Sequence, residues 1–289
     1  MAEITGIAWT DSTFNPWIGC TKVGPGCDHC YAEVQDSRKR WGGTTHWGAG
    51  VARYRTSASN WAQPIAWDKK AAASGKPWRV FCASLADVFD GDVDQAWRDD
   101  LWHLIFQTQH LSWLLVTKRV GNVRRMVPAQ WMNEKFPNNI RLLITVCNQE
   151  EADRDIPKLL ALPCKNGISY EPALGPVNFW LYLRPTTHAK KTPAQIAYAK
   201  STDDEWVWKA RFIDWIIAGG ESGSKARPFV LGWGKDTIRQ CQAAGVPVFF
   251  KQAGSNATNR EGVKHPFKDR AGADPAEWPP DLRIREFPK

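Results

Sequence analysis

The chain contains the stretch Trp113-Leu114-Leu115-Val116-Thr117-Lys118-Arg119, an apolar run that ends directly in polar and cationic residues. Its hydrophobicity is continuous rather than alternating, which is typical of a strand buried on both faces of a parallel sheet. We expect further strands of this kind at five other apolar runs. They lie at residues 79–84, 141–146, 166–170, 213–218 and 246–250.

Polar stretches that fit helices lie between these runs, at 94–108, 150–162 and 234–244. Repeated β-α units of this length predict parallel strands joined by right-handed crossovers. The expected fold is therefore of the α/β class, either an open sheet or a complete or partial (β/α) TIM-like barrel. At 289 residues and 43% hydrophobic content, the chain is long enough for one such domain.

Polar side chains follow the strands at the points where they end. The residues are Ser84, Asp87, Thr117, Lys118, Arg119, Thr145, Asn148, Glu171, Gly219, Gly220, Glu221, Lys251 and Gln252. In a barrel they would meet at the C-terminal rim, where such enzymes place their sites. For any one position, a helix cap or a polar loop residue is the simpler interpretation.

Three cysteines, Cys20, Cys27 and Cys30, share one loop near the start of the chain. Two thiolates separated by two residues can reach one metal centre, and Gly24-Pro25-Gly26 can return the third to them. A zinc ion with His29 or a distant cysteine as fourth ligand is one alternative. A disulfide is less favoured, because the seven cysteines are an odd number. We expect the four remaining cysteines to behave as small buried hydrophobes.

The formal charge of +8 and the pI near 9.1 favour an anionic partner, although a basic solvated surface is the ordinary explanation. Cations and tryptophans alternate after the cysteine loop, in a pattern that suits phosphates and stacked bases. They are Arg38, Lys39, Arg40, Trp41, Trp47, Arg53, Arg55 and Trp61. We find no apolar run that could span a bilayer and no signal-peptide flank, and therefore expect a cytoplasmic protein without membrane contact.

Several motifs carry a resemblance to a known family. They are Trp9–Cys20, Gly26–Glu33, Ser84–Phe89, Thr117–Arg119, Ser169–Pro176, Ala218–Gly223 and Ala226–Pro228. Together they resemble the radical S-adenosylmethionine (SAM) superfamily, and more closely a phage- and prophage-encoded branch of uncharacterised members. The cysteine spacing departs from the usual pattern of that superfamily, with six and then two intervening residues instead of three and then two.

The resemblance implies a barrel domain at 1–255 with a polar insertion at about 184–210. A polar C-terminal extension at 256–289 would pack on the barrel. It also implies a [4Fe-4S] cluster on Cys20, Cys27 and Cys30, whose open iron binds SAM. An external electron donor of the flavodoxin or ferredoxin type would supply the electron that breaks the sulfonium bond. The products would be methionine and a 5′-deoxyadenosyl radical, which abstracts hydrogen from the substrate.

Each polar part of SAM needs a complement in the protein. We expect Ser84 and Asp87 at the ammonium, Lys118 at the carboxylate, and Thr145 and Asn148 at the ribose. Tyr31 resembles the aromatic residue beside the cluster loop, although it could equally be a packing residue. Gly219 and Gly220 are expected at SAM or at a substrate hydroxyl. Glu171 and Glu221 are the expected catalytic carboxylates, with a salt bridge as the alternative for Glu171.

Two hypotheses for function follow. The first is a SAM-cleaving radical enzyme that acts on a nucleotide or nucleic-acid base, as an isomerase or rearrangement enzyme in the hypermodification of phage DNA. In that case the protein works in the cytoplasm of the host cell. The second is a zinc module without catalytic activity that binds nucleic acid. Colour separates them, because an iron–sulfur protein is brown and a zinc protein is colourless.

Overall fold

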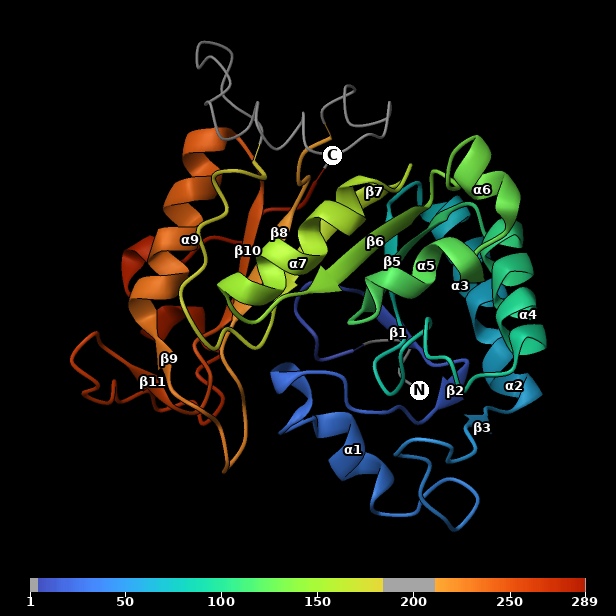
Figure 1. Ribbon diagram of the computed structural model, residues 1–289, viewed down its shortest axis with the longest axis horizontal. Coiled ribbons are helices and arrows are strands. Elements are labelled where there is room, and N and C mark those ends of the chain that lie inside the picture. Colours follow the sequence, from blue (N-terminus) through green and yellow to red (C-terminus); the bar gives the residue numbers. More distant parts are fainter. Residues whose placement is uncertain (1–4, 184–210, 289) are drawn as a thin grey trace. The chain divides into compact units, whose positions relative to one another are not determined.

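The computed structural model describes residues 5–183 and 211–288, and the chain divides into two compact units. Unit 1 holds Met1–Ile144 and Pro163–Lys165, and unit 2 holds Thr145–Leu162 and Asn166–Lys289. Figure 1 shows the helices and strands of the two units, coloured along the sequence. The expected polar insertion at 184–210 lies outside the described residues.

In unit 1 the elements follow one another as a mixture of short strands and helices. They are β1 (Ser12–Phe14), β2 (Trp17–Ile18), η1 (Pro25–Cys27), α1 (Tyr31–Asp36), β3 (Tyr54–Arg55), α2 (Ala58–Trp61), α3 (Gln63–Ser74), β4 (Trp78–Cys82), α4 (Gln95–Gln107), β5 (Leu111–Thr117), α5 (Val120–Met126), α6 (Ala129–Asn133) and β6 (Ile140–Thr145), whose last residue belongs to unit 2.

Among the described elements of unit 2, helix α9 has the most residues. The elements are α7 (Gln149–Leu160), β7 (Lys165–Tyr170), whose first residue belongs to unit 1, β8 (Ile216–Gly219), β9 (Phe229–Val230), α9 (Leu231–Ala244), β10 (Val248–Gln252), β11 (Ala257–Thr258), η3 (Pro275–Glu277) and η4 (Pro280–Leu282).

The parallel sheet of unit 1 is built around β4 and β5. Strand β4 pairs with β1 on one side, with Phe14 opposite Cys82, and with β5 on the other. Strand β5 continues to β6, with Leu115 opposite Leu142. All six residues of β6 are buried, which is the pattern of a strand covered on both faces.

Aromatic side chains fill the core of unit 1. The ring of Phe14 on β1 meets Trp113 on β5 edge to face, with their centroids 5.8 Å apart. Trp102 on α4 meets Trp131 on α6 in the same way at 5.1 Å. Helix α4 begins at its cap Asp94, whose carboxylate accepts a hydrogen bond from the amide of Ala96 at 2.9 Å.

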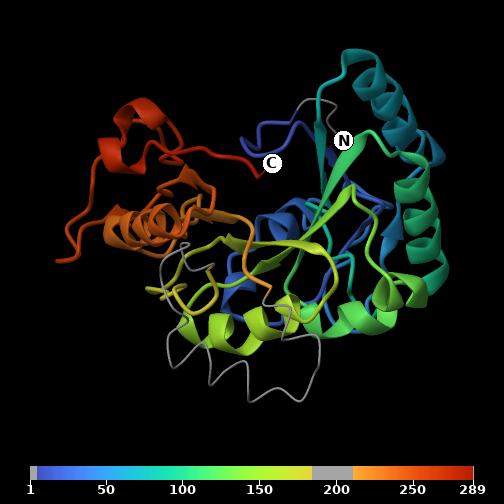
Figure 2. The ribbon, with the colours of Figure 1, turned by 90° about the horizontal axis from the view of Figure 1, so that it is seen from above.

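In unit 2, β8 lies between β7 and β10 and pairs with both in parallel, and the short strands β9 and β11 form a separate parallel pair. Helix α9, drawn in orange in Figure 2, packs on β8 and β10 and on η4. It is capped by Gly245, whose φ of 66° is left-handed. The chain after η4 returns to β10, where the Phe250 amide donates to the Ile284 carbonyl at 2.8 Å. The C-terminal segment thus pairs with an edge of these strands.

Parallel strands in both units confirm the α/β class expected from the sequence. Each of the six expected strands and each of the three expected helices corresponds to an observed element. Strand β1 was not expected, because it has only three residues and two of them are hydroxylic. Its polar Ser12 is nevertheless fully buried, and its hydroxyl accepts a hydrogen bond from the indole of Trp78 at 2.9 Å.

Asp11, which precedes β1, ties this short strand to β4. Its carboxylate accepts hydrogen bonds from the amide of Arg79 at 2.8 Å and from the Arg79 guanidinium at 2.9 and 3.0 Å. Burial raises the pKa of the Asp11 carboxyl, but the hydrogen bonds from Arg79 lower it by more. The pKa in the folded state therefore lies below the usual value of 3.8.

We predict that Asp11→Asn lowers the free energy of unfolding by about 1 kcal/mol at neutral pH, since the pair is partly exposed. A lowered pKa stabilises the fold fully above the unfolded-state pKa, and this contribution disappears as the pH falls through the folded-state pKa. Urea unfolding of both proteins from neutral pH to about pH 2.5 should therefore show a difference that shrinks with acid. Asp99→Asn, on the exposed side of α4, is the control; a difference for Asp11→Asn that does not change with pH would contradict the prediction.

Candidate functional site

The cysteine loop follows β2 in unit 1. The amide of Gly19 donates to the Leu85 carbonyl at 3.1 Å, which places the next residue, Cys20, beside the segment that follows β4. Gly19 has a φ of +110°, and a Cβ there would lie 2.3 Å from the His46 carbonyl oxygen, so only glycine fits. Cys20 and Cys27 are buried, and Cys30 is half-buried at the start of α1.

A buried arginine holds the first cysteine of the loop. Arg119, directly after β5, donates from Nη1 to the Cys20 sulfur at 3.2 Å and from Nη2 to the Thr21 carbonyl at 2.6 Å. The same Nη1 donates to Asp87 Oδ2 at 3.0 Å. Only 9% of the Arg119 side chain is exposed. One guanidinium therefore joins the cysteine loop to the loop after β4.

Burial and the carboxylate of Asp87 raise the pKa of the Cys20 thiol to about 12, although Arg119 acts in the opposite direction. Burial also lowers the pKa of Arg119, but Asp87 and the Cys20 sulfur raise it by more, and the net pKa lies above its usual value. Cys20 is therefore a thiol in the protein without metal. Metal binding deprotonates such a thiol outright.

Within residues 5–183 and 211–288, no three His, Cys, Asp or Glu side chains stand close enough to hold one metal ion together. The three cysteines thus share a loop without converging on a single point.

Asp87 is saturated with hydrogen bonds. Oδ1 accepts from the Thr117 hydroxyl at 2.7 Å and from the Phe89 amide at 2.9 Å. Oδ2 accepts from the Lys118 amide at 3.0 Å and from Arg119. A carboxylate offers about four lone-pair positions, so these donors fill it. The expected contact between Asp87 and the SAM ammonium stays a prediction, and it would require one of these donors to move.

Two further residues expected at SAM lie side by side in unit 1. The hydroxyl of Tyr31, the first residue of α1, donates to the Ser84 carbonyl at 2.6 Å. The Ser84 hydroxyl accepts from the amide group of Asn15 at 2.9 Å. Tyr31 is 54% exposed, so its ring is not a core packing residue. The cysteine loop and the end of β4 are joined here a second time.

The cations that follow α1 in the sequence differ in exposure and in their partners. Arg38, Lys39 and Arg40 are exposed. Arg53 is buried and paired with Asp90 at 2.8 Å and with Asp92 at 3.0 Å, so the expectation that it contacts phosphate was wrong. Arg55 lies 4.5 Å above the ring of Trp61 and pairs with Asp100 at 2.7 Å. Within this segment, the exposed positive charge is therefore that of Arg38, Lys39 and Arg40.

In unit 2 the expected ribose residues Thr145 and Asn148 have different roles. Asn148 caps α7 by accepting a hydrogen bond from the Glu151 amide at 2.9 Å. Thr145 ends β6 and is only 5% exposed, and its hydroxyl is one of the buried polar groups without a hydrogen-bond partner in the described parts of the chain. A buried hydroxyl without a partner is costly, which makes Thr145 the better candidate for a ligand contact.

Both expected catalytic carboxylates are paired with cations. Glu171, after β7, lies 2.9 Å from Lys251 Nζ on β10, and both side chains are half-buried. Glu221, after β8, accepts from the Arg227 amide at 2.9 Å and from its Nε at 3.1 Å. Each ion pair places a cation beside a carboxylate at the carboxyl end of β7 or β8.

Close packing explains the glycines after β8. A Cβ on Gly219 would lie 3.1 Å from the Gln252 carbonyl oxygen, and one on Gly220 would lie 2.5 Å from the Ala253 carbonyl oxygen. Gly254 (φ +82°) faces them, since its Cβ would lie 2.4 Å from the Glu221 carbonyl oxygen. The loops after β8 and β10 therefore require glycine to approach one another. A contact with SAM or substrate at Gly219 and Gly220 stays a prediction.

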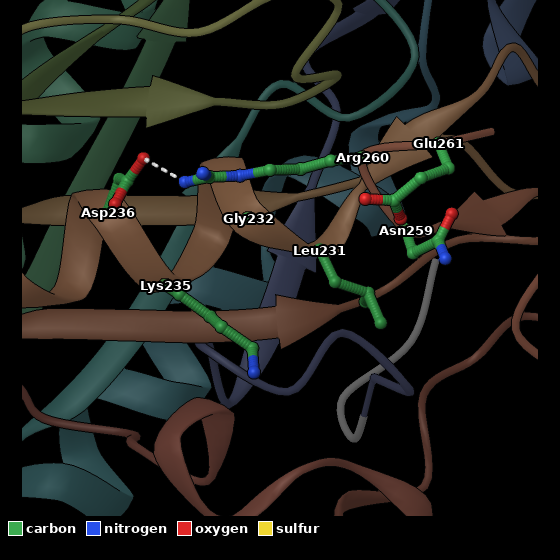
Figure 3. A pocket seen from close by; sticks show the side chains of 7 residues that line it. All are labelled: Leu231, Gly232, Lys235, Asp236, Asn259, Arg260 and Glu261. Carbon is green, nitrogen blue, oxygen red and sulfur yellow. Dashed lines mark ion pairs between the residues drawn. The ribbon is translucent and has the colours of Figure 1, made fainter. Parts of the chain in front are cut away.

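A surface pocket of about 370 Å³ lies at the start of α9 (Figure 3). It is lined by Leu231, Gly232, Lys235, Asp236, Asn259, Arg260 and Glu261, none of which the sequence had indicated. Arg260 lies over Gly232 and approaches Asp236 at 3.7 Å. Two cations and two carboxylates line the pocket, so its charge favours neither an anionic nor a cationic ligand.

Sequence reasoning missed Arg119 and Lys251 as site residues. Both belong to the polar residues that follow strands, but their partners Cys20 and Glu171 are 99 and 80 positions away in the sequence. Only the preference of buried cations for an anionic partner could have indicated such pairs.

In the described ranges, no helix has the length and apolar character needed to cross a membrane. No curated protein and no solved structure matches the chain. One family model matches residues 4–277, and no model of a radical SAM family does, so the identification with that superfamily was wrong. The chain belongs to the family described as "Protein of unknown function (DUF5131)".

Proposed function

We propose that the protein is an iron–sulfur enzyme that cleaves SAM reductively, on a partial barrel of parallel strands, and acts on a nucleotide or nucleic-acid base. The proposal concerns the chemistry of the residues and not membership of the radical SAM superfamily. The observation that carries it is the Cys20 sulfur, which accepts a hydrogen bond from the buried Arg119 at 3.2 Å. A cysteine held in this way, next to the ends of β4 and β5, is suited to ligate rather than to pack.

The donor set fits a cluster. Thiolates are the soft ligands that iron–sulfur clusters select, and three of them occur here in one loop. Ligands of a single ion converge on one point, whereas thiolates on three different irons lie farther apart. A cluster on Cys20, Cys27 and Cys30 therefore does not require the convergent group that one metal ion needs. Cys20, Cys27 and Cys30 would hold the cluster, and with an external electron donor it would supply one-electron reduction of the sulfonium of SAM.

The side chains around the loop would orient SAM. Tyr31 and Ser84 form one polar contact at the edge of the loop, and Lys118 is held by its amide to Asp87. Because Asp87 already accepts four hydrogen bonds, we assign it the task of fixing Arg119 and Lys118, with the SAM ammonium as a competing donor. Thr145 belongs to unit 2, where its buried hydroxyl has no partner among the described residues, and its contact with a ribose hydroxyl stays a prediction.

The paired carboxylates would serve the substrate. Glu171 stays close to Lys251 at 2.9 Å, so a proton could pass between a substrate and this pair without leaving an unpaired buried charge. Glu221 is held by Arg227 on two sides and is better suited to accept hydrogen bonds than to take a proton. The net charge of +8 and the exposed Arg38, Lys39 and Arg40 support a polyanionic substrate.

We predict that anaerobically reconstituted protein is brown and binds about four irons per chain. The triple variant Cys20→Ala, Cys27→Ala and Cys30→Ala should lose the iron and the colour, because it lacks all three thiolates. Cys241→Ala, in the buried face of α9, is the matched control and should keep both. Iron analysis and the visible spectrum measure this; a colourless wild type that contains zinc would favour the nucleic-acid-binding zinc module instead.

We predict further that the reconstituted wild type, given SAM and dithionite, releases 5′-deoxyadenosine, whereas the triple cysteine variant does not. Chromatography of the quenched mixture, with and without nucleosides or DNA, measures the product. A nucleotide or DNA that increases the yield identifies the substrate class. A cluster that forms without any cleavage of SAM would refute the enzymatic proposal.

We predict that DNA binding weakens steeply with salt and that replacing Arg38, Lys39 and Arg40 with Gln reduces the log–log slope by about 3, or roughly 0.9 per lost phosphate contact. Fluorescence anisotropy at several salt concentrations measures the slope. The control replaces the exposed lysines Lys69, Lys70 and Lys76, which changes the net charge equally but lies at α3 and the turn after it. Equal slopes for the two triple variants would contradict a local phosphate contact at the segment after α1.

A further inference from the structure

Arg119 is held on several sides. Asp87 accepts from its Nη1 at 3.0 Å, Thr21 accepts from its Nη2 at 2.6 Å, and Asp90 lies 3.8 Å from Nη2. Asp87 is itself fixed by the Thr117 hydroxyl and by two backbone amides. The guanidinium therefore has little freedom to turn away, and its donor to the Cys20 sulfur points in a fixed direction.

The contact distinguishes Cys20 from a cysteine that merely packs. Arginine is charged at every accessible pH, and acceptors that carry negative charge stabilise a buried guanidinium. Asp87 and Asp90 supply part of that charge. The hydrogen bond from Arg119 to Cys20 gains a negatively charged acceptor when the sulfur is a thiolate. A cysteine that ligates iron is in this state.

We propose that Arg119 is a positioning residue for the iron–sulfur cluster: it orients the Cys20 thiolate and, through its charged hydrogen bond to the sulfur, raises the reduction potential of the cluster. This inference rests on the proposed function, and it adds a residue that governs how readily the cluster accepts an electron.

The direction of the effect follows from charge. Reduction adds one electron to the cluster and makes it more negative, with no bond broken and no proton moved. A cation that donates a hydrogen bond to a ligand sulfur stabilises the more negative form. Loss of Arg119 removes that cation and should move the midpoint potential to a more negative value.

The test compares Arg119→Gln and Arg119→Lys with the wild type and with Arg124→Gln. Arg124 is the matched control, since it is an exposed arginine on the neighbouring helix α5. Each protein is reconstituted anaerobically, and its iron content is measured. It is then titrated with dithionite in the presence of redox mediators, and electron paramagnetic resonance detects the reduced cluster.

We expect Arg119→Gln to have a more negative midpoint potential than the wild type. Arg119→Lys, which keeps the charge but loses the fork of donors, should fall between them, and Arg124→Gln should match the wild type. If Arg119→Gln does not retain iron, the midpoint potential of Arg119→Lys is compared with that of the wild type instead. An iron-loaded Arg119 variant with the potential of the wild type would overturn the inference alone, whereas a wild type that binds no iron would overturn the proposed function together with it.

Discussion

The ion pair between Arg119 and Asp87 is the constraint on which this part of unit 1 depends. It joins three segments that are far apart in the sequence: the cysteine loop, the loop after β4 and the residue after β5. Both side chains are more than nine-tenths buried. Removing one partner of such a pair leaves a buried charge without compensation, at a cost of about 3–5 kcal/mol. The ion pair therefore fixes the position of Cys20 through the hydrogen bond from Arg119.

Arginines from three different segments organise the loop after β4. Arg53 pairs with Asp90 and Asp92, Arg98 on α4 donates to the carbonyls of Val88 and Asp90, and Arg119 pairs with Asp87. A loop of three aspartates would otherwise repel itself, because like charges at this spacing destabilise one another. The cations balance these charges and fix the loop, and Arg119 also joins it to the cysteine loop. This explains why a basic residue such as Arg53 is not available to a nucleic acid.

The apolar runs were sufficient to predict the strands, because a strand buried on both faces is a local pattern of five to seven residues. The same reasoning could not find β1, whose Ser12 and Thr13 are buried although they are hydroxylic, and the Ser12 hydroxyl accepts a hydrogen bond from Trp78. The cysteine loop was evident from spacing alone. The partners of Asp87 and Glu171 were not, because Arg119 and Lys251 reach them only after the chain has folded. The resemblance to the radical SAM superfamily was wrong, because the family model that matches residues 4–277 is that of another family.

Polar residues that follow the strands fall into two groups with different capacities for a ligand. Asp87, Glu221 and Asn148 already make the hydrogen bonds that their geometry allows or that a helix end requires. Such residues can fix their neighbours, but they gain little from a new partner. The buried hydroxyl of Thr145 lacks a partner and gains from any donor or acceptor that enters. Recognition of a cofactor or substrate is therefore expected at unsatisfied groups of this kind, and the saturated groups supply the rigid frame that aims them.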